Sequence, residues 1–192
     1  MLQLFSGIPT ILTLFRLFFS FFFTPALYYF LSPVTSPTNL FLALIFALVS
    51  LTDFLDGYLA RSWGQESIVG RLLDPIADKI WVMGPLIVLT ALNKIDPFWV
   101  FILLTREIVV MAIRSFCLEF QKTVPVSGAG KIKTALQYSY ITFALAGSWD
   151  PVMSPVLYWS EHLLLACAVI LSVWSGVRYT LQAVSLMSAV RN

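Results

Sequence analysis

The sequence predicts an all-α integral membrane protein with six transmembrane helices. Hydrophobic residues make up 59% of the 192-residue chain and charged residues only 11%, whereas about 25% of a typical soluble domain is charged. The mean hydropathy is +0.86. Six apolar windows are each long enough to cross a hydrocarbon layer about 30 Å thick, and they cover residues 8–31, 39–61, 70–92, 97–120, 131–148 and 155–184. We therefore expect a single transmembrane domain over residues 1–192.

The first window, 8–31, follows a segment that is too short to span a membrane. This segment, residues 1–7, has few polar residues, and we expect it to lie along the membrane interface. It lacks the basic start and the small-residue cleavage site of a signal peptide, so the first window is expected to remain as a span. A turn-rich stretch from Ser32 to Pro37 ends this window.

The other five windows are separated by short connections that suit antiparallel neighbouring helices. Windows 39–61 and 70–92 are joined by a polar stretch that begins at Arg61 and ends at Gly70. The remaining windows are separated by three further stretches, which run from Asn93 to Pro97, from Gln121 to Gly130 and from Gly147 to Pro151.

The basic residues are distributed unevenly between the two sides of the membrane. If alternate connections face opposite sides, Lys94 alone is clearly on one side. The opposite side then carries Arg61, Arg71, Lys122, Lys131, Lys133, Arg178 and Arg191. The positive-inside rule makes this second side cytoplasmic, together with both termini. Because no transit segment is visible, we expect a bacterial inner membrane, and the net charge of +2 without a basic run gives no indication of nucleic-acid binding.

Acidic residues lie at the adjoining ends of the second and third windows. Asp53 and Asp56 are three residues apart, which places them on one face of a helix, and Asp74 and Asp78 are four apart on the next helix. An ionised side chain inside a bilayer is costly unless it faces a polar cavity, an ion or a partner, so these acids are functional candidates. They also lie at one end of the membrane, whereas a metal-ion carrier, the alternative from another class, would need polar residues across its whole depth.

Two close pairs of carboxylates predict a site for a divalent metal ion. Mg²⁺ and Mn²⁺ prefer carboxylate oxygens together with substrate phosphate, and either ion would relieve the repulsion between the acids. Gly57 and Ala60 share the face of the first pair and leave space for a headgroup, while Arg61 can pair with a phosphate. The alternative is a structural one, in which the acids pair with nearby basic residues and the glycines serve helix packing. The basic residues in question are Arg61, Arg71 and Lys79.

The two acidic stripes together resemble the complete signature of the CDP-alcohol phosphotransferase family, which reads here Asp53-x₂-Asp56-Gly57-x₂-Ala60-Arg61-x₈-Gly70-x₃-Asp74-x₃-Asp78. The resemblance implies a six-helix membrane fold, usually homodimeric, that transfers a phosphatidyl or related group from a CDP-linked donor to an alcohol and releases CMP. It also implies that Asp53, Asp56 and Asp74 are metal ligands, and that Asp78 contacts the metal and acts as the general base. The spacing alone does not separate the roles of Asp74 and Asp78. The residues that the resemblance assigns to the nucleotide site are Asp53, Gly57, Ala60 and Arg61.

Polar residues outside this signature should indicate which alcohol is the acceptor. Arg106 and Arg114 lie eight residues apart in the fourth window, and Lys131 and Lys133 open the fifth. Together they predict an anion pocket that would hold a phosphate-bearing acceptor such as glycerol 3-phosphate by charge-assisted hydrogen bonds. Arg178 is a further candidate, placed only by its depth in the sixth window.

Some of these polar residues have a simpler interpretation that involves no acceptor. Lys133 and Arg178 could instead extend toward the membrane interface, as long basic side chains do. Glu107 could serve only to neutralise a basic neighbour.

Three strings resemble the branch of the family that uses CDP-diacylglycerol as donor and glycerol 3-phosphate as acceptor. They are Ile8-Pro9-Thr10, Arg106-Glu107 and Gly130-Lys131-x-Lys133-Thr134-x₂-Gln137, with Thr10 where that branch would have Asn. The alternatives keep the donor and change the acceptor, to phosphatidylglycerol or to inositol phosphate.

Overall fold

The structure is a computed structural model. It describes residues 8–31, 36–63, 68–120, 128–147 and 155–188, and within these ranges it does not describe the side chains of residues 8–11, 53–63, 68–72, 74, 129 and 131. The described residues form helices and no strand. The helices are α1 (Ile8–Phe30), α2 (Pro37–Trp63), α3 (Ile68–Ala91), α4 (Pro97–Glu119), α5 (Gly128–Ala146) and α6 (Pro155–Ser188). The prediction of an all-α fold with one helix for each apolar window is confirmed.

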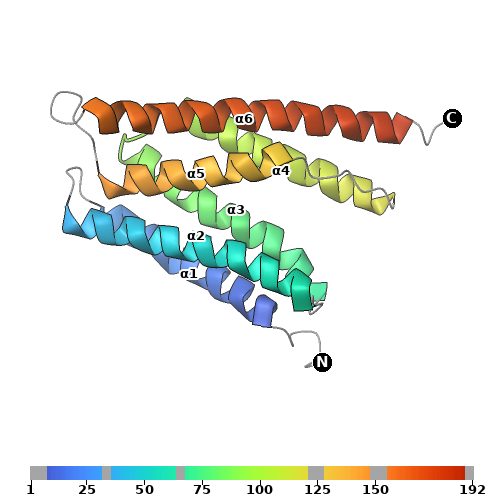
Figure 1. Ribbon diagram of the computed structural model, residues 1–192, viewed down its shortest axis with the longest axis horizontal. Helices are drawn as coiled ribbons and strands as arrows, with labels where there is room; N and C mark the ends of the chain where they lie inside the picture. Colours follow the sequence, from blue (N-terminus) through green and yellow to red (C-terminus); the bar gives the residue numbers. More distant parts are fainter. Residues whose placement is uncertain (1–7, 32–35, 64–67, 121–127, 148–154, 189–192) are drawn as a thin grey trace.

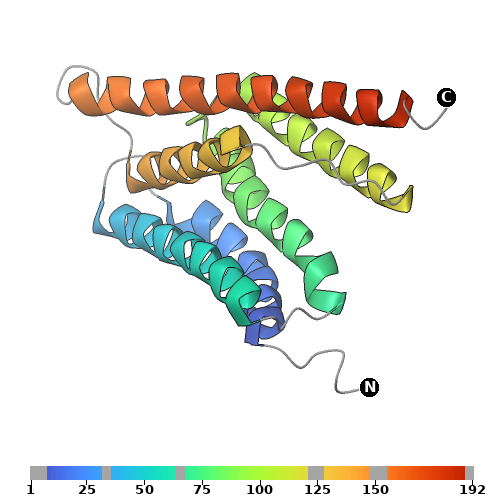
Figure 2. The same ribbon diagram turned by 45° about the vertical axis from the view of Figure 1, so that its right-hand side comes forward.

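The helices alternate in direction along the chain (Figure 1). In both views α2 ends and α3 begins at the end of the molecule where α1 begins and α6 ends (Figure 2). At the opposite end, the turn between α3 and α4 is short. Asn93 adopts a positive φ of 57° there, and Asp96 caps α4 by accepting a hydrogen bond from the Phe98 backbone nitrogen at 2.8 Å.

Two central helices hold the others together. Helix α3 packs against α1, α4 and α5, and α5 also packs against α2 and α6. Helix α6 lies along one side of the molecule against α4 and α5 (Figure 1). Side chains of α1, α3, α4 and α5 can therefore meet around the middle of the molecule.

Trp81 of α3 is at the centre of the packed interior and is 1% exposed. Its ring stacks on Phe46 of α2 and on Phe23 of α1, with a centroid separation of 5.1 Å in each case. The indole nitrogen donates a hydrogen bond to Ser50 Oγ at 2.9 Å, so the polar edge of the ring is satisfied. This cluster joins the first three helices.

Large apolar side chains cover the outside of the helices. On α1, for example, Phe21 is 74% exposed and Tyr29 is 79% exposed, which is typical of a surface that faces lipid. Among the described residues, two helices are long and apolar enough by length and composition to cross a membrane, namely Leu12–Phe30 and Pro155–Ser188, and Pro37–Thr52 is a shorter apolar helix. The protein is thus membrane-associated, and the six-span topology remains a prediction.

Candidate active site

The signature acids lie where the sequence predicts them along the helices. Asp53 and Asp56 belong to the last turns of α2, and Asp74 and Asp78 belong to the first half of α3. The helical spacing therefore holds for both pairs. The side chains of Asp53, Asp56 and Asp74 lie outside the described part of the structure, so their role as metal ligands remains a prediction. The same applies to the nucleotide-site residues Gly57, Ala60 and Arg61 and to Lys131.

Asp78 is the signature acid whose side chain is described. Its carboxylate accepts a hydrogen bond at Oδ1 from Nη1 of Arg16, at 2.8 Å. The Asp78 side chain is 40% exposed, whereas that of Arg16 is 5% exposed. A buried guanidinium of α1 therefore holds a carboxylate of α3 at the edge of the interior.

Glu107 of α4 is the centre of a buried charge cluster. It is 3% exposed and accepts hydrogen bonds from three cationic side chains, those of Lys79, Lys133 and Arg106. These cations come from α3, α5 and α4, so the cluster joins three helices. Among the described residues, the cluster has one carboxylate for three basic side chains and thus an excess of formal positive charge, and burial makes such an excess costly unless an anion offsets it.

Arg106 contacts α6 with most of its guanidinium group. Its Nε donates to the Ser172 carbonyl at 3.1 Å, and its Nη2 donates to Ser175 Oγ at 2.9 Å. Its Nη1 donates to Glu107 at 3.2 Å. A Cβ added at Gly176 would lie 3.0 Å from Arg106 Cγ, so this glycine lets the arginine lie close against α6. Arg106 thus supports Glu107 from behind and does not present a free guanidinium to an acceptor.

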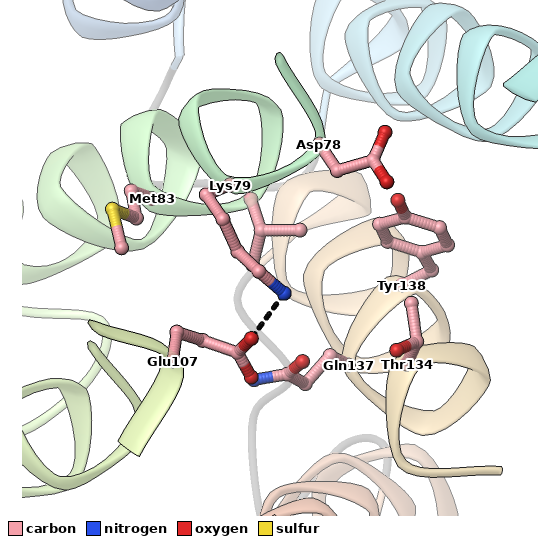
Figure 3. A pocket seen from close by; sticks show the side chains of 8 residues that line it. Asp78, Lys79, Met83, Glu107, Thr134, Gln137 and Tyr138 are labelled. Carbon is pink, nitrogen blue, oxygen red and sulfur yellow. Dashed lines mark hydrogen bonds and ion pairs between the residues drawn. The ribbon is translucent and has the colours of Figure 1, made fainter. Parts of the chain in front are cut away.

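A cavity opens between Asp78 and the Glu107 cluster (Figure 3). Lys79 and Glu107 are hydrogen-bonded to each other in one part of its wall, and Asp78 and Tyr138 line another part. The remaining lining residues come from α3 and α5, and they are Val82, Met83, Thr134 and Gln137. A carboxylate that can accept a proton and a cation that can hold an anion therefore share one cavity.

The predicted acceptor residues divide into two groups. Lys133 is buried and Arg106 is partly buried, and both belong to the Glu107 cluster. Lys133 is 1% exposed, so the alternative that it extends to the membrane interface is wrong. Arg114 and Arg178 are exposed. The Arg178 guanidinium lies 5.0 Å from the centre of the Trp174 ring, and neither exposed arginine forms an ion pair with another described residue.

The alternative roles of two other residues are also resolved. Glu107 does neutralise basic neighbours, and one of them, Lys79, lines the cavity together with Glu107. Lys79 pairs with Glu107, whereas the structural alternative paired it with the signature acids.

Sequence reasoning assigned no role in the site to Arg16 or to Lys79. Both are charged residues within apolar windows, which is the same signal that identified the acids. Gln137 carries a similar signal as a polar side chain in the fifth window, 3% exposed.

Comparisons with known proteins show what the sequence resembles. Residues 6–174 match the sequence model of the CDP-alcohol phosphatidyltransferase family. The chain is 36% identical over 183 residues to a protein of Shigella flexneri serotype 5b (strain 8401) named "CDP-diacylglycerol--glycerol-3-phosphate 3-phosphatidyltransferase". A protein of the same name from Escherichia coli (strain K12) is likewise 36% identical. Each alignment covers 90% of this chain and 92% of the relative.

Proposed function

This chain belongs to the CDP-alcohol phosphatidyltransferase family, and we propose that it transfers the phosphatidyl group of CDP-diacylglycerol to glycerol 3-phosphate. The products are phosphatidylglycerophosphate and CMP, so the reaction is a step of phospholipid biosynthesis. The relatives that cover most of the chain are named for this donor and this acceptor.

The observation that carries the choice of acceptor is the cation-rich cluster around Glu107. An acceptor phosphate that enters the cavity meets Lys79, whose side chain is 30% exposed. Lys133 and Arg106 lie behind Glu107 and add to the positive potential. A phosphate offsets the excess charge of the cluster through charge-assisted hydrogen bonds. An acceptor without a phosphate monoester brings less negative charge to offset the excess that the described residues of the cluster carry.

The proposed step is a displacement at phosphorus. The primary hydroxyl oxygen of glycerol 3-phosphate attacks the phosphorus that bears the diacylglycerol. A phosphorus–oxygen bond forms there while the bond from this phosphorus to the bridging oxygen breaks, and CMP leaves with the bonding electron pair. The hydroxyl proton passes to the Asp78 carboxylate, which acts as general base. Arg16 holds that carboxylate in place.

The donor set fits a divalent metal ion. Asp78 is a partly exposed carboxylate at the edge of the cavity. Positions 53 and 56, in the last turns of α2, and position 74, near the start of α3, are also aspartates. Hard oxygen ligands of this kind suit Mg²⁺ or Mn²⁺. When bound by Asp53, Asp56, Asp74 and Asp78, the metal supplies charge neutralisation for the pyrophosphate. Gly57, Ala60 and Arg61 of α2 receive the cytidine end of the donor.

The membrane arrangement follows the charge distribution. Six spans with both termini in the cytoplasm place the signature acids at the cytoplasmic face of a bacterial inner membrane. The acyl chains stay in the bilayer while the headgroup enters the cavity. A homodimer is the expected assembly.

The test is an assay of CMP release by the purified protein with CDP-diacylglycerol and a panel of acceptors. The panel holds glycerol 3-phosphate, inositol phosphate and phosphatidylglycerol. We expect CMP release with glycerol 3-phosphate, its loss when EDTA removes divalent metal, and its recovery with Mg²⁺ or Mn²⁺. CMP release that favours another acceptor would overturn the choice of acceptor, and no CMP with any acceptor would overturn the enzyme activity.

A further inference from the structure

Gln137 is a buried polar side chain that the charge cluster does not use. It is 3% exposed, and its Nε2 has no hydrogen-bond partner among the described residues. The side chain lines the cavity and extends from α5 toward Lys79 and Glu107 (Figure 3). Buried amide donors are nearly always hydrogen-bonded, so an unsatisfied one that faces a cavity indicates a ligand.

The position of Gln137 along α5 narrows the kind of ligand group. Lys133 lies one helical turn before it, on the same face. Asp78 lies across the cavity on α3, and both residues line the same space. An acceptor with its phosphate at the cation cluster and its attacking hydroxyl at Asp78 therefore spans the cavity that Gln137 lines, so its middle carbon lies in the same space as the amide.

The neighbouring neutral donor is less available. Thr134 Oγ1 donates to the Gly130 carbonyl at 3.1 Å, so its hydroxyl hydrogen is already used. The other described side chains with an unsatisfied buried polar atom, Lys94, Ser172 and Tyr179, do not line this cavity. Tyr138 is the other neutral donor in the described part of the cavity wall, but only the Gln137 amide is a buried donor without a hydrogen-bond partner there.

We propose that the Gln137 amide donates a hydrogen bond to the secondary hydroxyl of the acceptor and thereby selects a phosphorylated polyol over a phosphorylated simple alcohol. This inference rests on the proposed function, because it takes the acceptor to be glycerol 3-phosphate. Gln137 is then a specificity-determining residue. A site that is built to bond a hydroxyl discriminates strongly against an analogue that lacks it.

The test compares two acceptors that differ only in the secondary hydroxyl, glycerol 3-phosphate and 3-hydroxypropyl phosphate. Both keep the phosphate and a primary hydroxyl. We expect the wild-type protein to prefer glycerol 3-phosphate in kcat/KM by at least about tenfold, the effect of one hydrogen bond in a buried site. This measurement needs no variant, and equal kcat/KM values for the two acceptors would overturn the inference.

The variant Gln137→Met separates recognition from packing. Methionine keeps the length and volume of the side chain and removes the donor. We expect kcat/KM for glycerol 3-phosphate to fall by about tenfold, because the hydrogen bond to its secondary hydroxyl is lost. The kcat/KM for 3-hydroxypropyl phosphate should stay unchanged. An equal loss with both acceptors would mean that Gln137 only supports the cavity wall, and it would overturn the proposal.

A matched control is Gln182→Met in α6, a partly buried position outside the cavity, which should leave both values unchanged. The failure of this inference is distinguishable from the failure of the proposed function. If the wild-type protein releases no CMP with glycerol 3-phosphate, the proposed function is wrong. If it does so without discriminating between the two acceptors, only the role of Gln137 is wrong.

Discussion

Arg16 of α1 donates a hydrogen bond from Nη1 to Oδ1 of Asp78 in α3 at 2.8 Å, although 62 positions separate the two residues. The backbone carbonyl of Arg16 accepts a hydrogen bond from Ser20 Oγ at 2.8 Å. Through its guanidinium, the first helix orients the carboxylate that we propose as the general base.

Asp78→Asn should leave the protein folded and almost inactive. The amide oxygen of asparagine can still accept the hydrogen bond from Arg16, but it cannot take the acceptor proton. We expect the rate of CMP release to fall by a factor on the order of 10²–10⁴, the usual contribution of a general base. Binding of CDP-diacylglycerol should be retained, whereas the melting temperature in detergent should fall, because the buried Arg16 loses this anionic partner. A variant that keeps the wild-type rate would refute the assigned role.

Arg16→Met should lower kcat because Asp78 loses the group that orients it. A hydrogen bond to a charged group contributes about 1.5–3 kcal/mol, so we expect a loss of roughly 10- to 100-fold in kcat, with little change in KM for glycerol 3-phosphate. Arg16→Lys keeps the charge and should recover part of the rate.

A double-mutant cycle tests whether Arg16 acts through Asp78. In the Asp78→Asn background, Arg16→Met should cost much less than it does in the wild type, because interacting residues are not additive. Losses that simply multiply would mean that Arg16 and Asp78 act independently.

The six helices were predictable because each depends on one continuous apolar stretch. Their limits differ from the windows by a few residues, as α5 begins at Gly128 and α6 extends to Ser188. The helical placement of the acids was also predictable, since Asp53 and Asp56 are related by spacing within α2, and Asp74 and Asp78 within α3. Such spacing depends only on helical periodicity.

The contacts between helices could not be read from spacing. The pairing of Arg16 with Asp78, and of Lys79 with Glu107, depends on how α1, α3 and α4 are rotated about their axes when they pack. Helix α6 illustrates the same point. Hydrophobicity was its main signal in the sequence, yet Ser172 and Ser175 hold Arg106. Whether Lys133 is buried or extends to the membrane interface likewise depends on where the fold places its partner Glu107.

Glu107→Gln should destabilise the protein strongly. The carboxylate is 3% exposed and is bonded to Lys79, Lys133 and Arg106. Glutamine leaves these cations without their anion, and removing one partner from a buried charge network costs about 3–5 kcal/mol. We expect a lower melting temperature in detergent.

The charge explanation for Glu107 has its own control. Adding Lys133→Met to Glu107→Gln removes one uncompensated buried charge, so the double variant should melt at a higher temperature than Glu107→Gln alone. If Lys133→Met lowers the melting temperature further in that background, the cluster is not held together by charge balance.

Gly84→Ala tests the close approach of α1 to α3 that brings Arg16 to Asp78. A Cβ at Gly84 would lie 2.3 Å from Thr24 Oγ1 and 3.2 Å from Thr24 Cγ2, so the two helices must separate or Thr24 must move. Overpacking of this kind costs about 1–3 kcal/mol, and we expect a lower melting temperature together with a lower rate of CMP release. Gly128→Ala is the matched control, because nothing lies within 4 Å of a Cβ there. Thr24→Ala should partly restore Gly84→Ala by removing the two closest atoms. If Gly84→Ala melts like the Gly128→Ala control, the helices are not as closely packed at this point as the structure indicates.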